Sequence, residues 1–196
     1  MNDKERDRRI TDLGTLKALA HPLRMRLMRG LTIARAATAS QLAEQVDEAV
    51  SLVSYHLRKL AEYGLIQEAE PRSTDSRERW WEPASDGLTI RHEDFRDAPE
   101  KAAAHTAASR LFFEQRADMY RNYLDERAYW GEEWNAAAES SEATVRLTAA
   151  ELARLTAEML ALVRRYDEQG RAAEAAGDTE GRETVAVHTY SFPFRP

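Results

Sequence analysis

TASQLAEQVDEAVSLVSYHLRKLAEYGLI, from Thr38 to Ile66, contains two short helical patterns joined by a tight break. Gln41, three residues after Thr38, completes the form of a capping box and predicts the start of a first helix. Gly64 predicts the end of the second helix. Two helices this short and this closely joined need a third element behind them, which favours a helix-turn-helix. The apolar stripe of the second helix is Val50, Val53, Leu57 and Leu60.

The other faces of the second helix carry side chains that suit binding in a DNA groove. Hydroxyls and polar rings can contact phosphates or base edges, and basic side chains attract phosphates. Taken singly, each of these residues also fits an ordinary packed or solvated position. The predicted contacts of this recognition helix are Ser51, Ser54, Tyr55, His56, Arg58 and Lys59.

Three motifs in order resemble the winged helix-turn-helix of ArsR-type bacterial transcriptional regulators. The runs LA at 42–43, VSYHLRKL at 53–60 and GLI at 64–66 resemble its two helices. ALAHPLRMRLM at 18–28 resembles the segment that opens the core of that family, and RERWW at 77–81 resembles its wing. The resemblance covers about the first 85 residues and implies double-stranded DNA as a partner.

Two positions depart from the pattern of that family. Asp47 stands where the turn between the helices usually has glycine, and Ala49 stands where serine or threonine often caps the recognition helix. Aspartate tolerates left-handed backbone geometry, so we expect the turn to form. Alanine lacks the hydroxyl that makes a cap contact.

Two segments with strand character, 65–69 and 79–82, flank the polar loop PRSTDSRE and predict a wing hairpin. Arginines at a loop tip can reach a narrow minor groove, and they are equally well explained as solvated charges. The predicted DNA contacts at the helix-turn-helix entry and the wing are Thr38, Gln41, Arg72, Arg77 and Arg79.

Composition excludes several function classes. The 196 residues include no cysteine, which removes disulfides and thiolate metal sites. We find no nucleophile, base and orienter set and no phosphate-binding loop, so we predict no enzyme, no catalytic residue and no cofactor. His92, Glu93 and Asp94 are bunched, but a metal site there would need His105 or His188 as well, and we predict none.

Charge and hydropathy set the expected compartment and the expected DNA-binding half. No apolar run is long enough for a membrane span and no signal peptide is evident, so we expect a cytoplasmic protein without a membrane partner. The net charge of −6 divides into +1 for residues 1–83 and −7 for the remainder. The first part is therefore the expected phosphate partner, through local arginines rather than a broad basic field.

The predicted fold class is mainly α with a small β content (α+β). A winged helix-turn-helix domain spans 1–85 and begins with a charged lead-in at 2–9. A connector spans 86–98. Within the first domain, a helix from Ile10 is expected to end before Pro22, which opens the next helix. The remaining module, 99–196, is expected to contain a long helix at 99–129, a strand at 143–147, a helix at 148–169 that stops at Gly170, and a strand at 184–192.

The aromatic residues of the second half have two interpretations. One is an ordinary core and dimer interface, and the other is a cavity for an apolar or planar effector. A long helix near 99–134 favours a homodimer that reads a near-palindromic operator. The alternative is a winged-helix module that binds proteins without sequence-specific DNA binding. The residues of the predicted effector pocket are Phe112, Tyr120, Tyr123, Trp130, Trp134, Tyr190 and Phe192.

Overall fold

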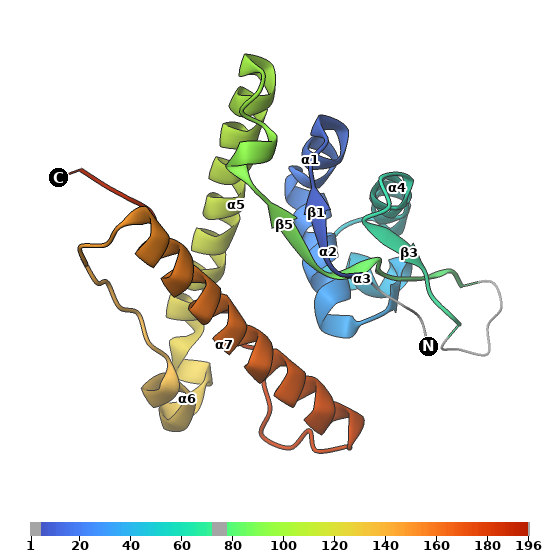
Figure 1. The fold of residues 1–196 in the computed structure, drawn as a ribbon. Coiled ribbons are helices and arrows are strands. Elements are labelled where there is room, and N and C mark those ends of the chain that lie inside the picture. Colours follow the sequence, from blue (N-terminus) through green and yellow to red (C-terminus); the bar gives the residue numbers. More distant parts are fainter. Residues whose placement is uncertain (1–4, 72–77, 196) are drawn as a thin grey trace. The chain divides into compact units, whose positions relative to one another are not determined.

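The computed structural model describes residues 5–71 and 78–195 and divides the chain into two compact units, Met1–Leu124 and Asp125–Pro196. None of the helices in these described ranges is long and apolar enough to cross a membrane. The elements of the first unit (Figure 1) are β1 (Glu5–Ile10), α1 (Leu13–Leu19), α2 (Pro22–Ala34), β2 (Ala37–Thr38), α3 (Ala39–Val46), α4 (Val50–Glu62), β3 (Ile66–Glu68), β4 (Trp80–Pro83), β5 (Ser85–Ile90), the 3₁₀ helix η1 (His92–Asp94) and α5 (Pro99–Glu126), whose last two residues belong to the second unit.

Local chemistry explains how the two central helices begin and end. The hydroxyl of Thr38 accepts a hydrogen bond from the Gln41 amide, and the Gln41 side chain accepts one from the Thr38 amide, which confirms the predicted capping box. Asp47 adopts the left-handed conformation at φ 52°, so the turn forms without glycine. Ala49 precedes α4 and provides no side-chain cap.

The core of the first unit lies between α2, α3 and α4. Gly30 allows α2 and α3 to approach closely, because a Cβ there would lie 2.9 Å from Leu42 Cδ2. Arg26 of α2 fixes the end of α3 by donating to the Val46 carbonyl oxygen at 2.5 Å. The fully buried side chains at the centre are Leu16, Leu27, Leu31, Leu42, Val53, Leu57, Leu60 and Leu65.

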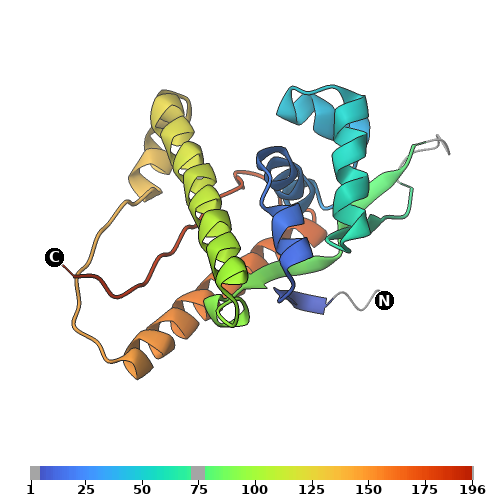
Figure 2. The ribbon, with the colours of Figure 1, turned by 90° about the horizontal axis from the view of Figure 1, so that it is seen from above.

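The wing is a three-stranded antiparallel sheet in the order β2-β4-β3. Trp81 pairs with Ala37 on one side and with Glu68 on the other, and its buried indole belongs to the core. Trp80 is buried as well. The sheet lies beside the end of α4 (Figure 2), where the Leu65 amide donates to the Leu60 carbonyl oxygen at 2.9 Å.

A second sheet joins the start of the chain to the segment after the wing. β1 pairs in parallel with β5, from Glu5 opposite Ser85 to Ile10 opposite Ile90 (Figure 1). The predicted lead-in at 2–9 is therefore mostly strand where the structure describes it, and the helix expected from Ile10 is only α1. Alternation in DRRI is too short to reveal a strand whose partner lies far along the sequence.

The structure includes the predicted connector 86–98 in the first unit. Residues 85–90 form β5, and Phe95 is fully buried in the same core as α2 to α4. Gly87, inside the predicted connector, pairs with Asp7 of β1. The boundary between the two compact units lies after Leu124, inside the long helix, and not near residue 85.

The second unit is helical, with η2 (Arg127–Tyr129), α6 (Gly131–Ala137) and α7 (Ala149–Ala175). The predicted long helix at 99–129 is present as α5 followed by η2. The capping box of Thr148 and Glu151 opens α7 as expected. Gly170 does not end this helix, because a central glycine costs only about 1 kcal/mol and helix-forming residues follow it.

The two strands predicted in the second half are wrong. Residues 138–148 and 182–195 contain neither helix nor strand. Alternating apolar residues produce a strand only where a neighbouring edge accepts their backbone hydrogen bonds. The second unit offers no such edge within its described residues, and the β part of the predicted C-terminal module is absent there.

Candidate nucleic-acid interface

The recognition helix α4 has one buried face and one exposed face. Its buried residues are Val53, His56, Leu57 and Leu60. Ser51, Tyr55 and Arg58 are exposed, whereas Ser54 and Lys59 are half-buried. This exposed face presents two hydroxyls, one phenol and two cations along a single helix, which are the groups that contact phosphates and base edges.

The two cations of this face differ in their partners. No hydrogen bond or ion pair holds the Arg58 side chain in the described part of the chain, so its guanidinium is available to a phosphate. Lys59 Nζ lies 2.7 Å from Glu62 Oε2, and this contact raises the pKa of Lys59. DNA must compete with Glu62 for Lys59, so Arg58 is the stronger candidate for a phosphate contact.

His56 is not on the DNA-facing side, contrary to the sequence prediction. It is 7% exposed, and its ring lies 4.6 Å from the ring of His21, centroid to centroid. Position 56 is three residues after Val53 and four before Leu60, which places it on the buried stripe. His56 therefore supports α4 from behind.

The two residues predicted to contact DNA at the helix-turn-helix entry, Thr38 and Gln41, form hydrogen bonds with each other. Thr38 is only 4% exposed, and its hydroxyl is engaged in the capping box of α3. Gln41 is exposed, and its side-chain oxygen accepts the Thr38 amide. Only the Gln41 amide nitrogen remains to contact DNA, so the main role of this pair is to start α3.

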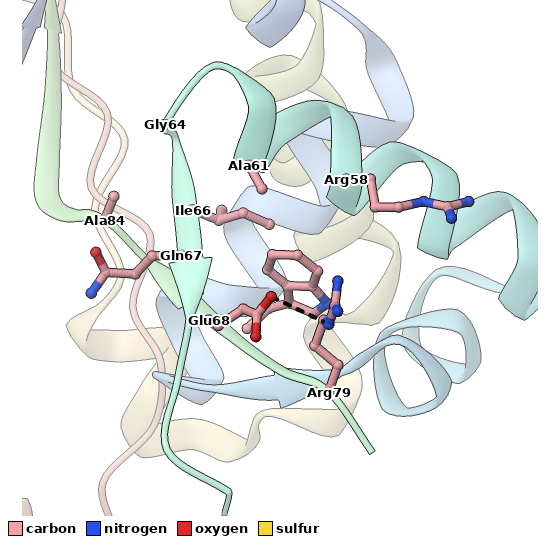
Figure 3. Close-up of a pocket in the computed structure, with 9 residues that line it drawn as sticks. Arg58, Ala61, Gly64, Ile66, Gln67, Glu68, Arg79 and Ala84 are labelled. Carbon is pink, nitrogen blue, oxygen red and sulfur yellow. Dashed lines mark ion pairs between the residues drawn. The ribbon is translucent and has the colours of Figure 1, made fainter. Parts of the chain in front are cut away.

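The base of the wing forms a groove beside the end of α4. Arg58 from α4 and Arg79 next to β4 both line this groove, which has a volume of about 530 Å³ (Figure 3). Arg79 Nε lies 3.3 Å from Glu68 Oε1, and its guanidinium lies over the Trp81 ring at 5.6 Å. These contacts hold Arg79 against β3 and β4 at the wall of the groove. Arg72 and Arg77, predicted at the wing tip, lie outside the described residues.

Two apolar residues that the sequence analysis did not assign to the interface are exposed on α4. Leu52 is 40% exposed, and Val50, predicted to be buried, is 46% exposed. Both lie in the first turn of the helix, the part that contacts base edges in helix-turn-helix proteins. Apolar side chains in the major groove contact the methyl group of thymine. The sequence held one sign of this exposed apolar surface, because Leu52 is apolar but lies off the stripe of buried residues.

The bunched residues His92, Glu93 and Asp94 turn to different partners. The described residues hold no group of three or more His, Asp or Glu side chains that could bind a metal ion. Glu93 and Asp94 turn toward Arg9, and only His92 and His105 come together, with ring centroids 5.3 Å apart.

The buried pair of His21 and His56 predicts a dependence of stability on pH. Both Nδ1 atoms are buried without a hydrogen-bond partner. Burial lowers the pKa of each ring, and the positive charge of Arg24 lowers both further, with His21 adding to the effect on His56. The folded chain therefore favours neutral rings.

The free energy of unfolding should consequently fall as the pH drops below about 6.5, the ordinary pKa of histidine. In that range the unfolded chain binds protons that the folded chain excludes, whereas above about pH 7 these two rings contribute no slope. Urea denaturation between pH 5 and 8 measures this dependence. The His56→Gln variant should show a shallower slope, and an unchanged slope would contradict the assignment.

Comparison with known proteins gives one family match. Residues 19–68, which include α2, α3, α4 and β3, match the model of a helix-turn-helix domain. No curated protein matches the chain.

Several solved structures are similar to part of this chain. The transcriptional repressor PagR of Bacillus anthracis is 19% identical over 49% of this chain and 90% of its own, with a TM-score of 0.32. A structure titled as a possible transcriptional regulator for arsenical resistance is 24% identical over 66% of this chain and 100% of its own, with a TM-score of 0.32. NadR in complex with 4-hydroxyphenylacetate is 17% identical over 63% of this chain and 79% of its own, with a TM-score of 0.34.

Proposed function

We propose that this chain is a sequence-specific DNA-binding transcriptional regulator that binds a near-palindromic operator as a homodimer. The match of residues 19–68 to a helix-turn-helix domain supports this proposal. The observation that carries the proposal is the division of α4 into two faces. The core fixes one face, and the other presents Ser51, Tyr55 and Arg58 to solvent.

The modest charge of the first half shapes how this reader works. Residues 1–83 carry only +1, so a single copy gains little from the general attraction of the phosphate backbone. Two copies add their contacts, and a rigid link between them raises the effective concentration of the second reader. Pairing therefore compensates for a weak individual contact.

Exposed apolar side chains on the long helices support pairing of two chains. α5 has 28 residues, of which only Ala108 is buried, and α7 has no buried residue. Tyr120 and Leu124 of α5 are each more than 40% exposed, as are Leu160, Leu162 and Tyr166 of α7. Apolar surface of this kind is typical of helices that pack against a partner subunit. Light scattering on the purified chain should give twice the 22.3 kDa mass of one chain.

The aromatic residues predicted to bind an effector are divided between the two units. Phe112 packs against the core of the first unit, and the rings of Tyr120 and Tyr123 lie 6.0 Å apart. In the second unit, the rings of Trp130 and Trp134 lie 6.4 Å apart. Tyr190 and Phe192 are exposed there. These side chains support modulation by an apolar or aromatic small molecule, which a thermal-shift screen of such compounds tests.

Alanine substitutions on α4 test the reader. An operator is first selected from random duplex DNA or found by genomic footprinting. We expect Ser54→Ala, Tyr55→Ala and Arg58→Ala each to weaken operator binding, with the largest loss, about 1–3 kcal/mol, at a side chain that contacts a base. If Arg58 contacts a phosphate, its removal should also lower the slope of log affinity against log salt by about 1.

The matched control for these variants is Lys101→Ala, which removes one cation from α5. It should leave operator affinity within about twofold of the unchanged chain, and circular dichroism should be the same for all variants. Unchanged affinity in all three α4 variants would refute the assignment of α4 as the reader. Failure to select any DNA would favour the protein-interaction alternative, which the near-neutral first half keeps in consideration.

A further inference from the structure

A second groove lies on the first unit, between η1 and the first half of α5. It has a volume of about 490 Å³, within the size range of pockets for small organic molecules. His105, Ser109 and Phe113 follow one another at spacings of four on α5, so they form one row along the groove. Arg110 and Glu114 form the neighbouring row, and His92 faces them from η1.

Aromatic rings give this groove a flat wall. The ring of His105 stacks on Phe95 with centroids 5.5 Å apart, and it meets the edge of His92 at 5.3 Å. Burial, with a smaller contribution from His92, lowers the pKa of His105. The lowered pKa favours the neutral form of this ring, whose face stacks on Phe95. Phe113, which is 52% exposed, continues the wall by two helical turns.

The groove also holds a cation that the fold does not use. Arg110 has no hydrogen bond or ion pair in the described ranges, whereas Arg121 of the same helix lies 2.5 Å from Asp118. A guanidinium binds a carboxylate through two parallel hydrogen bonds. Ser109, which precedes Arg110 in the sequence and carries a hydroxyl, also lines the groove. Glu114 lines the same wall, which disfavours ligands with a second negative charge.

We propose that this groove binds a small aromatic carboxylic acid. Its carboxylate lies on Arg110, and its ring packs against Phe113 and the imidazoles of His92 and His105. A neutral aromatic compound retains the ring contacts but leaves Arg110 without a partner. A dianionic compound is repelled by Glu114. The site is separate from the aromatic set discussed above, with which it shares no residue.

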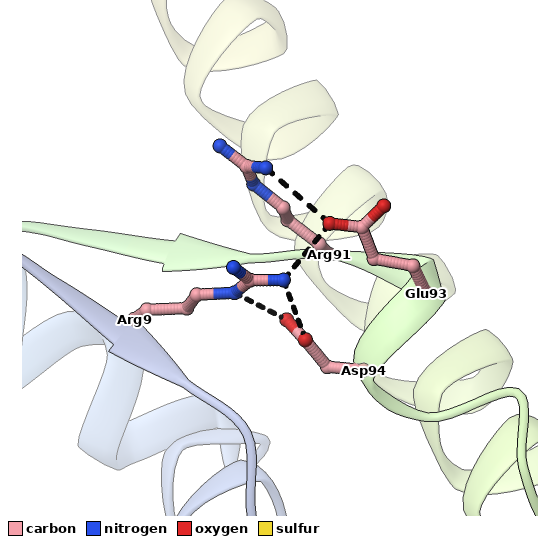
Figure 4. A network of polar contacts seen from close by, with 4 residues as sticks. All are labelled: Arg9, Arg91, Glu93 and Asp94. Carbon is pink, nitrogen blue, oxygen red and sulfur yellow. Dashed lines mark hydrogen bonds and ion pairs between the residues drawn. The ribbon is translucent and has the colours of Figure 1, made fainter.

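The wall of the groove is connected to the recognition helix through β1. Arg9 donates to Asp94 at 2.8 and 2.6 Å and to Glu93 at 2.8 Å, so β1 holds η1 (Figure 4). Arg91 adds a contact of 3.3 Å to Glu93. The adjacent residue, Arg8, donates to the carbonyl oxygens of Tyr63 and Gly64 at the end of α4.

Two neighbouring side chains of one strand therefore link the groove to the end of the DNA reader. A ligand that shifts η1 pulls on Arg9, and Arg8 transmits the shift to the C-terminal end of α4. This coupling rests on the proposed function, whereas ligand binding itself does not. For the ligand to change DNA affinity, it must bind the two arrangements of η1 with different affinities.

Calorimetry on the full chain tests the groove with 2-naphthoate and its neutral analogue 2-naphthamide as probes. We expect 2-naphthoate to bind the unchanged chain and to bind Arg110→Gln at least tenfold more weakly. The matched control Lys101→Gln, on the same helix but outside the groove, should bind like the unchanged chain. The amide should bind weakly and equally to all three. Absence of binding to the unchanged chain at millimolar 2-naphthoate, or equal affinity for Arg110→Gln, overturns the site.

Fluorescence anisotropy with the selected operator tests the coupling. Saturating 2-naphthoate should change the DNA affinity of the unchanged chain at least threefold. Arg8→Gln, which removes the contact at the end of α4 and leaves η1 held by Arg9, should bind 2-naphthoate with nearly the same affinity but lose that response. If 2-naphthoate binds and DNA affinity does not respond, the site stands and the coupling is wrong. If no DNA is bound at all, the proposed function fails, and calorimetry still decides the groove.

Discussion

Leu57→Ala should lower the free energy of unfolding by about 2–5 kcal/mol. Leu57 is fully buried in the centre of α4, in the core formed with α2 and α3. Its truncation removes apolar contacts and leaves a cavity that a closely packed core fills only in part. Native stabilities of single domains are typically about 5–15 kcal/mol, so a loss of this size removes a large share of the total.

Urea denaturation followed by circular dichroism measures this loss. The matched control is Leu52→Ala on the same helix, since Leu52 is 40% exposed and lies off the buried stripe. We expect its unfolding free energy to change by about 0.5 kcal/mol or less, while its DNA affinity falls if Leu52 contacts a thymine methyl group. Equal destabilisation by the two substitutions would mean that α4 is not anchored by the face described above.

Phe95→Ala is the second large effect, with an expected loss of about 3–5 kcal/mol. Phe95 is fully buried in the core of the first unit, and its ring also stacks on His105 of α5. The substitution therefore removes one contact that ties the segment after β5 to both the winged helix and the long helix. The helix-turn-helix and α5 should lose stability together, in one transition.

Differential scanning calorimetry follows this transition, and Phe192→Ala provides the control. Phe192 is 69% exposed in the second unit, so its removal should shift the melting temperature very little. If Phe95→Ala leaves the melting of the winged helix unchanged, the result favours the division expected from the sequence, with a connector at 86–98.

The parts of the fold that local chemistry determines could be predicted from the sequence. The capping boxes at Thr38 and Thr148, the left-handed turn at Asp47 and the stripe of α4 depend on residues within one or two helical turns of one another. The same holds for most of the exposed face of α4. Such signals are complete in a short window, and the structure confirms them except for Val50, which is exposed.

The errors come from features that depend on distant partners. β1 and β5 form strands because they pair with each other, although they lie far apart in the sequence. Neither segment shows this pairing on its own. Residues 143–147 and 184–192 alternate like strands but pair with no strand among the described residues. The burial of His56 is an intermediate case, since its spacing from Val53 predicted the buried face and its polar ring suggested the opposite.

The parallel pairing of β1 with β5 also determines the order in which the parts of the first unit fold. Joining Glu5 to Ser85 closes a loop of about 80 residues, at an entropic cost of about 4 kcal/mol on an ideal-chain estimate. The contacts among α2, α3 and α4 are local and form first. β1 therefore docks late in folding and detaches early in native-state fluctuations. Each such opening releases the Arg8 contact at the end of α4 while the three-helix core stays folded.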